Sequence, residues 1–156
     1  MRALKQVLIA VGLMLAAASV QAVESKAHKA STQPVDALWQ KIGDFCGISA
    51  WHPAVAKCEL SADKKERTLT LKGGGTIVEH LVRWSDAAHS YTYRIVSGPL
   101  PVDHYVSTLR VAADKSGSGS IISWRGHYLA KGASDADAKK AIDGIYESGL
   151  AALAGN

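Results

Sequence analysis

The sequence predicts an α+β fold in which a curved antiparallel sheet of about seven strands wraps around one long C-terminal helix. The first observation is that runs of alternating apolar and polar residues follow one another between residues 57 and 129. The second is that short turns join these runs, which favours an antiparallel meander. The third is the segment 135–154, whose apolar residues recur at helical spacing. With a first strand and two short helices ahead of residue 57, these elements form one domain, 23–156.

The first 22 residues are predicted to be an export signal rather than part of the fold. Arg2 and Lys5 precede an apolar run at 7–18, and Val20 and Ala22 are small residues at the positions that signal peptidase reads. The run is shorter than the roughly 20 residues that a membrane span needs, although an uncleaved anchor is the alternative. We therefore expect cleavage after Ala22 and a periplasmic or secreted domain with no stable membrane span.

Two short helices form the stretch around which the rest of the chain is organised. Residues at i, i+3, i+4 and i+7 give the first helix an apolar face, which consists of Val35, Leu38, Trp39 and Ile42. Ser31 or Thr32 is expected to cap this helix, with Pro34 in its first turn. Gly47 allows a bend, and Pro53 ends the second helix. A bent apolar pair of this kind needs a surface to cover, and the strands that follow supply it.

Both cysteines lie in this region, Cys46 between the two short helices and Cys58 after the second. An exported chain meets an oxidising compartment, so the pair is expected to form a disulfide. The bridge closes a loop around Trp51–Pro53 and stabilises the fold by roughly 3 kcal/mol. Two free buried thiols are the alternative. The chain contains no CxxC motif, which argues against thiol catalysis.

The remaining segments follow in a simple order. The predicted strands after residue 60 are 67–72, 76–85, 90–97, 104–113 and 120–129. Ser134 or Asp135 is expected to cap the long helix. Its apolar face is assigned to Ala138, Ala141, Ile142, Ile145, Gly149 and Leu153. Because several of these are small, the space opposite Gly149 is expected to be open.

Alternation along the later strands assigns the side chains that face the helix. The inward set is Tyr91, Tyr93, Ile95, Tyr105, Ser107, Leu109, Val111, Ile122, Trp124 and Tyr128. Aromatic bulk with a few hydroxyls suits a small, largely apolar ligand that carries one or two polar groups. The expected contacts are Tyr93, Ile95, Tyr105, Ser107, Leu109 and Trp124 from the sheet, with Ala141, Ile145 and Gly149 from the helix. A solid core made of the same residues is the alternative.

Four motifs carry a resemblance to a known family. They are Trp39 with Ile42-Gly43-Asp44-Phe45, Trp51-His52-Pro53, Glu79-His80-Leu81, and Leu100-Pro101-Val102 before Tyr105. The chain resembles the helix-grip proteins of the START-like (SRPBCC) superfamily, which are described as polyketide cyclase/dehydrase and lipid-transport proteins. It is similar in particular to small exported bacterial members, including accessory proteins of methanol oxidation. More distantly it resembles plant abscisic-acid receptors and the Bet v 1-like birch-pollen allergen. The resemblance implies the fold, whereas the superfamily includes binders, transporters, cyclases and hydroxylase domains.

The strand 76–85 has two faces that compete for the inside. Alternation alone favours Val78, His80, Val82 and Trp84 as the buried set. The resemblance to abscisic-acid receptors implies the opposite, with Glu79 and Leu81 in the cavity. A buried Glu79 has a raised pKa unless a cation or hydroxyl pairs with it, and it can then bind a ligand hydroxyl or act as a general acid or base. A purely structural bond to a neighbouring tyrosine is the alternative.

Two loops are placed at the rim of the cavity by the same resemblance, which matches them to the gate and latch loops of the plant receptors. The first is Gly73, Gly74 and Gly75, and the second contains Pro99, Leu100 and Pro101. The glycines also fit a plain hairpin turn. They do not form a nucleotide site, because a strand rather than a helix follows them.

Composition and spacing exclude several classes of partner. The formal net charge is +4, and loss of Arg2 and Lys5 leaves +2. That charge is mild and scattered, so no nucleic-acid partner is expected. The histidines and cysteines lack metal-ligand spacing, so neither a metal nor a cofactor is expected.

Three functional hypotheses remain. The first is an exported binder or carrier of a small hydrophobic, lipid- or polyketide-like molecule. The second is a cyclase or dehydratase that uses Glu79 with Tyr93 or Tyr105. The third is an accessory protein that docks on a periplasmic dehydrogenase through an exposed apolar patch.

Overall fold

The computed structural model describes residues 21–155, and the predicted export signal therefore lies almost entirely outside the described residues. The elements in chain order are β1 (Val23–Ser31), α1 (Val35–Ile42), α2 (Ile48–Trp51), β2 (Val55–Leu60), β3 (Glu66–Leu71), β4 (Thr76–Ser85), β5 (Ser90–Ser97), β6 (Val102–Ala113), β7 (Ser120–Ala130) and α3 (Asp135–Ala154). This order matches the predicted one.

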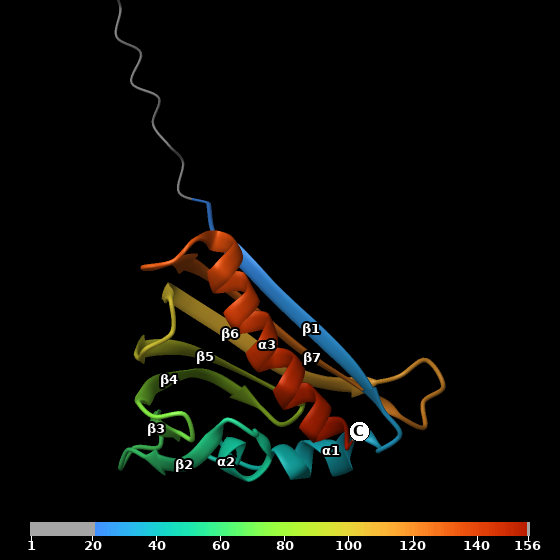
Figure 1. Ribbon diagram of the computed structural model, residues 1–156. Coiled ribbons are helices and arrows are strands. Elements are labelled where there is room, and N and C mark those ends of the chain that lie inside the picture. The colour runs from blue at the N-terminus through green and yellow to red at the C-terminus, as the bar shows by residue number, and fades with distance from the viewer. Residues whose placement is uncertain (1–20, 156) are drawn as a thin grey trace, which may run out of the picture.

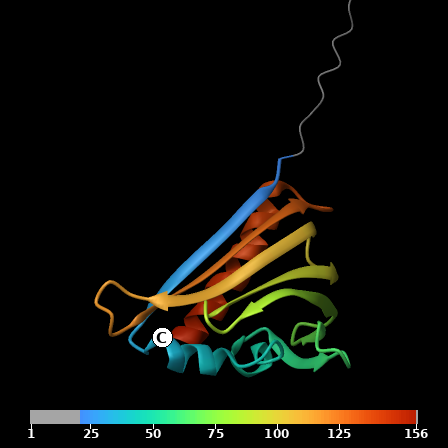
Figure 2. The same ribbon diagram turned by 180° about the vertical axis from the view of Figure 1, so that it is seen from behind.

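The strands form one antiparallel sheet of seven strands in the order β1-β7-β6-β5-β4-β3-β2. α3 lies across one face of the curved sheet, while α1 and α2 close the end near β2 (Figure 1). Seen from behind, the strands cover α3 (Figure 2). The predicted α+β helix-grip architecture is therefore confirmed. It places the functional region between α3 and the concave side of the sheet.

The predicted inward faces of the last three strands are confirmed. Tyr93 pairs with Ser107 across β5 and β6, and Leu109 pairs with Trp124 across β6 and β7. All four side chains are buried. Residues that are paired directly across a sheet point to the same face. Once the inward residues of one strand are known, the inward residues of its paired neighbours follow.

β4 does not follow a single alternation. Glu79 is buried, as the resemblance implied, and it faces the helix side together with Ile77. A register shift between Leu81 and Arg83 then exchanges the two faces. Beyond it Trp84 points inward and stacks on Tyr91 with ring centroids 5.2 Å apart. The resemblance is therefore correct for Glu79, whereas alternation is correct for Trp84 and wrong for Val82, which is exposed.

The two helix starts differ from each other. α3 is capped as predicted, because the Ser134 hydroxyl accepts a hydrogen bond from the amide of Asp137. The cap expected for α1 is wrong: Pro34 occupies the N-cap position and no side chain caps the helix. The Ser31 hydroxyl accepts instead from the Gln33 amide, outside the helix.

The predicted disulfide is present between Cys46 and Cys58. It joins the connection between α1 and α2 to β2, at the end of the sheet that these helices close. The bridge therefore fastens α2 to the sheet edge beside the candidate site.

The inward face of α3 differs from the prediction. Ala138, Ile142, Gly149 and Leu153 are buried as expected, but Ala141 and Ile145 are only half-buried. Tyr146 and Leu150, which the prediction omitted, are fully buried. The buried stripe is therefore displaced around the helix, because the sheet crosses α3 at an angle that the sequence pattern does not specify (Figure 1).

Candidate functional site

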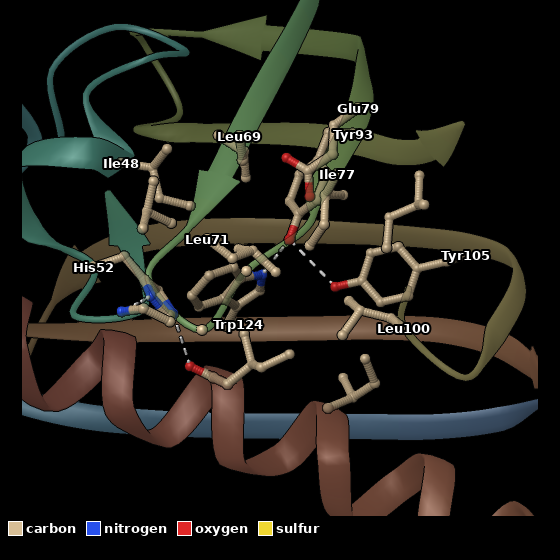
Figure 3. Close-up of a pocket in the computed structure, with 17 residues that line it drawn as sticks. Ile48, His52, Leu69, Leu71, Ile77, Glu79, Tyr93, Leu100, Tyr105 and Trp124 are labelled. Atoms are coloured by element: carbon tan, nitrogen blue, oxygen red, sulfur yellow. Dashed lines mark hydrogen bonds between the residues drawn. The ribbon is translucent and has the colours of Figure 1, made fainter. Parts of the chain in front are cut away.

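A cavity of about 310 Å³ lies between α3, α2 and strands β3 to β7 (Figure 3). Aliphatic side chains, among them Leu69, Leu71 and Ile142, form most of its wall. The polar groups of Glu79, Tyr93 and Tyr105 gather on one side, and the His52 ring lies apart from them. The volume is at the lower end of the roughly 300–1,000 Å³ of small-molecule sites. The space is therefore suited to a small, mainly apolar molecule.

Several predicted contact residues do line this cavity. From the predicted ligand set these are Glu79, Tyr93, Ile95, Tyr105, Trp124 and Ile145. From the predicted rim loops, Gly73, Gly74 and Leu100 line it. Gly75 lies beside the tip of the other loop, since a Cβ on it would be 3.6 Å from the Pro99 ring. Pro99 and Pro101 themselves line a neighbouring polar depression.

Five other predicted contacts lie outside the cavity wall: Leu81, Ser107, Leu109, Ala141 and Gly149. Ser107 is covered by Tyr146, whose hydroxyl it contacts at 2.9 Å. Leu109 is completely enclosed in the core. Leu81 adjoins the register shift in β4, and Ala141 lies on the half-buried side of α3.

The open space expected opposite Gly149 is absent. A Cβ atom at this position would lie 2.7 Å from His52 Cδ2 and 2.9 Å from Trp124 Cζ3. Both distances are shorter than van der Waals contact, so the two rings already fill this region. Gly149 is a close-approach residue, and the prediction that it opens the cavity is wrong.

A buried ion pair sits behind the polar side of the cavity. Arg67 Nε donates to Glu79 Oε2 at 2.5 Å, and Arg67 Nη1 donates to the carbonyl of Phe45. The guanidinium also lies 4.1 Å from the centroid of the Phe45 ring and 5.1 Å from that of Tyr93. Glu79 is thus paired with an arginine rather than with the tyrosine that the sequence reading considered.

Burial and charge act in opposite directions on this pair. Burial raises the pKa of Glu79 above its ordinary value, and the Arg67 guanidinium beside it offsets this only in part. Burial also works against the charge on Arg67, but the nearby Glu79 carboxylate keeps its pKa above the ordinary value. Removal of one partner from a buried pair of this type costs about 3–5 kcal/mol, because the other charge stays buried. The pair is therefore a strong constraint on the position of the Glu79 carboxylate.

His52 connects the second short helix to α3. It is the C-cap residue of α2, and its Nε2 lies 3.1 Å from the carbonyl oxygen of Ile145. Its Nδ1 accepts a hydrogen bond from the amide of Ala54. Since Nδ1 is an acceptor, the proton of the neutral ring is on Nε2, which donates to Ile145. Burial lowers the pKa of His52, so this neutral form is favoured.

The tyrosines between sheet and helix form a continuous hydrogen-bonded row, and Figure 3 shows its first part, from Trp124 through Tyr93 to Tyr105. Trp124 Nε1 donates to Tyr93 Oη at 3.1 Å, and Tyr93 Oη lies 3.2 Å from Tyr105 Oη. Tyr105 Oη lies 2.6 Å from Tyr146 Oη, which in turn lies 2.9 Å from Ser107 Oγ. Tyr146 also stacks on Trp124, with centroids 4.7 Å apart. The row runs from the cavity wall into the core.

Sequence reasoning missed three polar residues of this region: Arg67, His52 as a cavity residue, and Tyr146. Arg67 is spaced two and four residues from Leu69 and Leu71, which places it on the same face of the strand, and this spacing is visible in the sequence. Tyr146 sits where Gly126 leaves room, because a Cβ on Gly126 would collide with the Tyr146 hydroxyl. No local pattern indicates that pairing between α3 and β7.

Comparison with known proteins gives the family. The model of the family "Polyketide cyclase / dehydrase and lipid transport" matches residues 22–156. The chain belongs to this family. No match was found among curated proteins.

Solved structures show that this polyketide cyclase/dehydrase fold recurs in diverse bacteria. The protein XoxI from Bacillus cereus is 30% identical, with a TM-score of 0.83 over 85% of this chain and 94% of its own. A protein from Nitrosospira multiformis is 19% identical, with a TM-score of 0.72 over 85% and 94%. The Zhui aromatase/cyclase from Streptomyces sp. R1128 is 15% identical, with a TM-score of 0.70 over 86% and 93%. The last two share the fold alone.

Family membership and the apolar cavity together support a ligand-binding member of the superfamily. Within residues 21–155, no group of three His, Cys, Asp or Glu side chains is arranged to hold a metal ion. None of the helices in this part of the chain has the length and apolar character needed to cross a bilayer.

Proposed function

We propose that this protein binds and carries a small hydrophobic molecule in the cavity between its sheet and α3, after export from the cytoplasm. The observation that supports this most directly is the cavity itself, which is walled mainly by apolar side chains and has a few polar groups on one side. That composition is typical of a site in which burial supplies affinity and the polar groups supply orientation.

The glycine loop at the rim of the cavity favours a carrier, whose cavity opens, over a permanently closed core. Gly73 and Gly74 line the cavity, and nothing lies within 4 Å of where their Cβ atoms would be. Gly74 and Gly75 also have positive φ angles, which glycine adopts without strain. The loop between β3 and β4 can therefore change conformation at low cost, and movement away from Pro99 admits a ligand.

The test is a direct search for the ligand followed by a block of its site. Native mass spectrometry of protein isolated from the cell envelope should show a bound hydrophobic compound, and organic extraction should release it. Ile145→Phe adds an aromatic ring to the cavity wall from a half-buried position and should abolish uptake of a hydrophobic fluorescent probe. The matched control is Val82→Phe, at a residue 54% exposed on the outer side of the sheet, which should leave uptake unchanged.

The enzymatic alternative is tested by the same protein preparation. Turnover of a polyketide-like substrate that falls by about 100-fold or more in Glu79→Gln would favour a cyclase or dehydratase over a carrier. An unmodified protein that binds no probe and carries no compound would contradict the carrier proposal. The accessory-protein hypothesis would then come first.

A further inference from the structure

The hydrogen-bonded row beside the cavity has a direction that can be found by counting protons. A serine or tyrosine hydroxyl carries one proton and therefore donates only one hydrogen bond. Burial raises the pKa values of Tyr93 and Tyr105 far above the ordinary value, and that of Tyr146 as well, so all three keep their protons. The row contains as many contacts as protons, which leaves one consistent assignment.

The count starts at the end that lies deepest in the core. Ser107 Oγ donates to the carbonyl oxygen of Arg125 at 2.9 Å, because a carbonyl can only accept. Ser107 has no second proton, so Tyr146 is the donor in the contact between the two hydroxyls. By the same reasoning Tyr105 donates to Tyr146, and Tyr93 donates to Tyr105. Trp124 supplies its indole proton to Tyr93.

Every proton in the row is thus used by its next neighbour, and none is left for a ligand in the cavity. Tyr93 and Tyr105 line the cavity but can offer it only lone pairs. His52 has no spare donor either, since its Nε2 proton is used by the Ile145 carbonyl. Arg67 Nη2 has no hydrogen-bond partner in the described part of the chain, but it is enclosed and does not belong to the cavity wall.

The remaining polar group of the wall is the Glu79 carboxylate. Its Oε2 is held by Arg67. Oε1 has no hydrogen-bond partner among residues 21–155, and because Glu79 lines the cavity, this oxygen is the acceptor left for a ligand. The polar side chains of the wall therefore offer a ligand only hydrogen-bond acceptors.

We propose that the cavity selects a small apolar molecule that carries a neutral hydrogen-bond donor, a phenol or an alcohol, which donates to Glu79 Oε1. A ketone, an ether or a carboxylate of the same shape finds no donor. A cationic amine gains less than an alcohol, because the positive charge of Arg67 lies next to the carboxylate. This inference rests on the proposed binding function and specifies its ligand class.

The experiment compares two probes that differ only in the donor, 2-naphthol and its methyl ether 2-methoxynaphthalene, by fluorescence titration of the full chain. A hydrogen bond to a charged acceptor corresponds to about tenfold to a hundredfold in affinity, so 2-naphthol should bind tighter than the ether by at least tenfold. Equal affinities, or a preference for the ether, would overturn the ligand class while leaving the carrier proposal intact. Binding of neither probe overturns the ligand class, and it overturns the carrier proposal as well if the isolated protein also carries no compound.

A pair of variants tests the direction of the protons. Tyr105→Phe removes the acceptor of the Tyr93 proton, which then becomes available at the cavity wall. The affinity ratio between naphthol and ether should therefore fall severalfold. The control is Tyr128→Phe, because Tyr128 stacks on Tyr105 but its hydroxyl contacts Ser25, outside the row. This control should keep the wild-type ratio.

A merely structural role for Tyr105 predicts a different result, in which both probes weaken equally and the ratio is unchanged. That result contradicts the proposed direction. Glu79→Gln is an independent check. The amide oxygen of the new side chain faces Arg67, so its amide nitrogen presents protons to the cavity. The preference for the naphthol over the ether should then disappear or reverse. A preference that survives this change would show that Glu79 is not the acceptor.

Discussion

At the scale of single residues, polar side chains that are buried near the cavity determine its chemistry. Arg67 and Glu79 show how such residues can be found: both lie on the inward parity of their strands, although a charged residue in that position conflicts with a simple apolar pattern. Each is buried because the other is present. From the sequence, Glu79 was expected inside only by resemblance, and Arg67 was overlooked because alternation was scored on apolar residues alone.

His52 gives a prediction at this scale. Burial lowers its pKa below the ordinary value of 6.5, with the positive charge of Arg67 acting in the same direction. Between the lowered pKa and 6.5 the unfolded chain binds a proton that the folded protein does not. The His52 contribution to stability is therefore complete above pH 6.5 and decreases as the pH falls through that window. Urea unfolding between pH 7.5 and 5 should show a larger loss of stability for the wild type than for His52→Gln.

The difference between the two proteins isolates His52, because the other titrating groups are common to both. Identical pH dependences, or a wild type that gains stability relative to the variant on acidification, would contradict the assigned neutral ring. An NMR titration of the His52 ring provides a second measurement of the same pKa.

At the scale of elements, α3 contains two glycines that occupy opposite environments. Gly149 faces the His52 and Trp124 rings at less than contact distance, whereas nothing lies within 4 Å of a Cβ added to Gly144, which is exposed. Both lie inside the helix, where alanine is favoured over glycine by up to about 1 kcal/mol. Sequence alone cannot distinguish them, since the difference depends on what the sheet and α2 bring to each position.

The two glycines should therefore respond to the same substitution with opposite signs. Gly149→Ala should lower the free energy of unfolding by about 1–3 kcal/mol, because the new methyl group overpacks the two rings. Gly144→Ala should raise it by up to about 1 kcal/mol. Thermal or urea unfolding measures both. A neutral or stabilising Gly149→Ala would mean that the space beside Trp124 is open after all.

β4 shows the second limit of pattern reasoning at this scale. Its shift in register between Leu81 and Arg83 brings both Glu79 and Trp84 to the inner side, although their spacing assigns them to opposite faces. A bulge inserts one residue without any required sequence signature, so alternation fails beyond it. The consequence is functional, because Glu79 reaches the cavity while Trp84 packs with Trp39 under α1.

At the scale of the whole molecule, the disulfide holds the end of the fold that carries His52. The bond joins residues 12 positions apart and ties α2 to β2. Replacement of both cysteines by alanine should lower stability by roughly 3 kcal/mol, because the open chain recovers loop entropy on unfolding. Hydrogen exchange should accelerate first in residues 47–55, with β6 and β7 protected longest.

Uniform acceleration across the sheet, or protection lost first in β6 and β7, would contradict this order of opening. Loss of the bridge should also weaken binding of a cavity probe, since Ile48 and His52 belong to the wall. The unmodified protein under non-reducing conditions is the reference, and it should show no titratable thiol after denaturation.

The sequence by itself determined the fold class, the order of the elements, the disulfide and the inward faces of β5, β6 and β7. The disulfide follows from two cysteines in a chain that is predicted to be exported, and the rest follows from local periodicity and short antiparallel connections. Only the tertiary structure decided that Arg67 neutralises Glu79, that Tyr146 rather than Ala141 faces the sheet, and that Gly149 is packed. The first depends on the register of β3 against β4, which sets Arg67 directly opposite Glu79. The other two depend on the angle at which α3 crosses the sheet, and such long-range packing leaves no periodic pattern in the sequence.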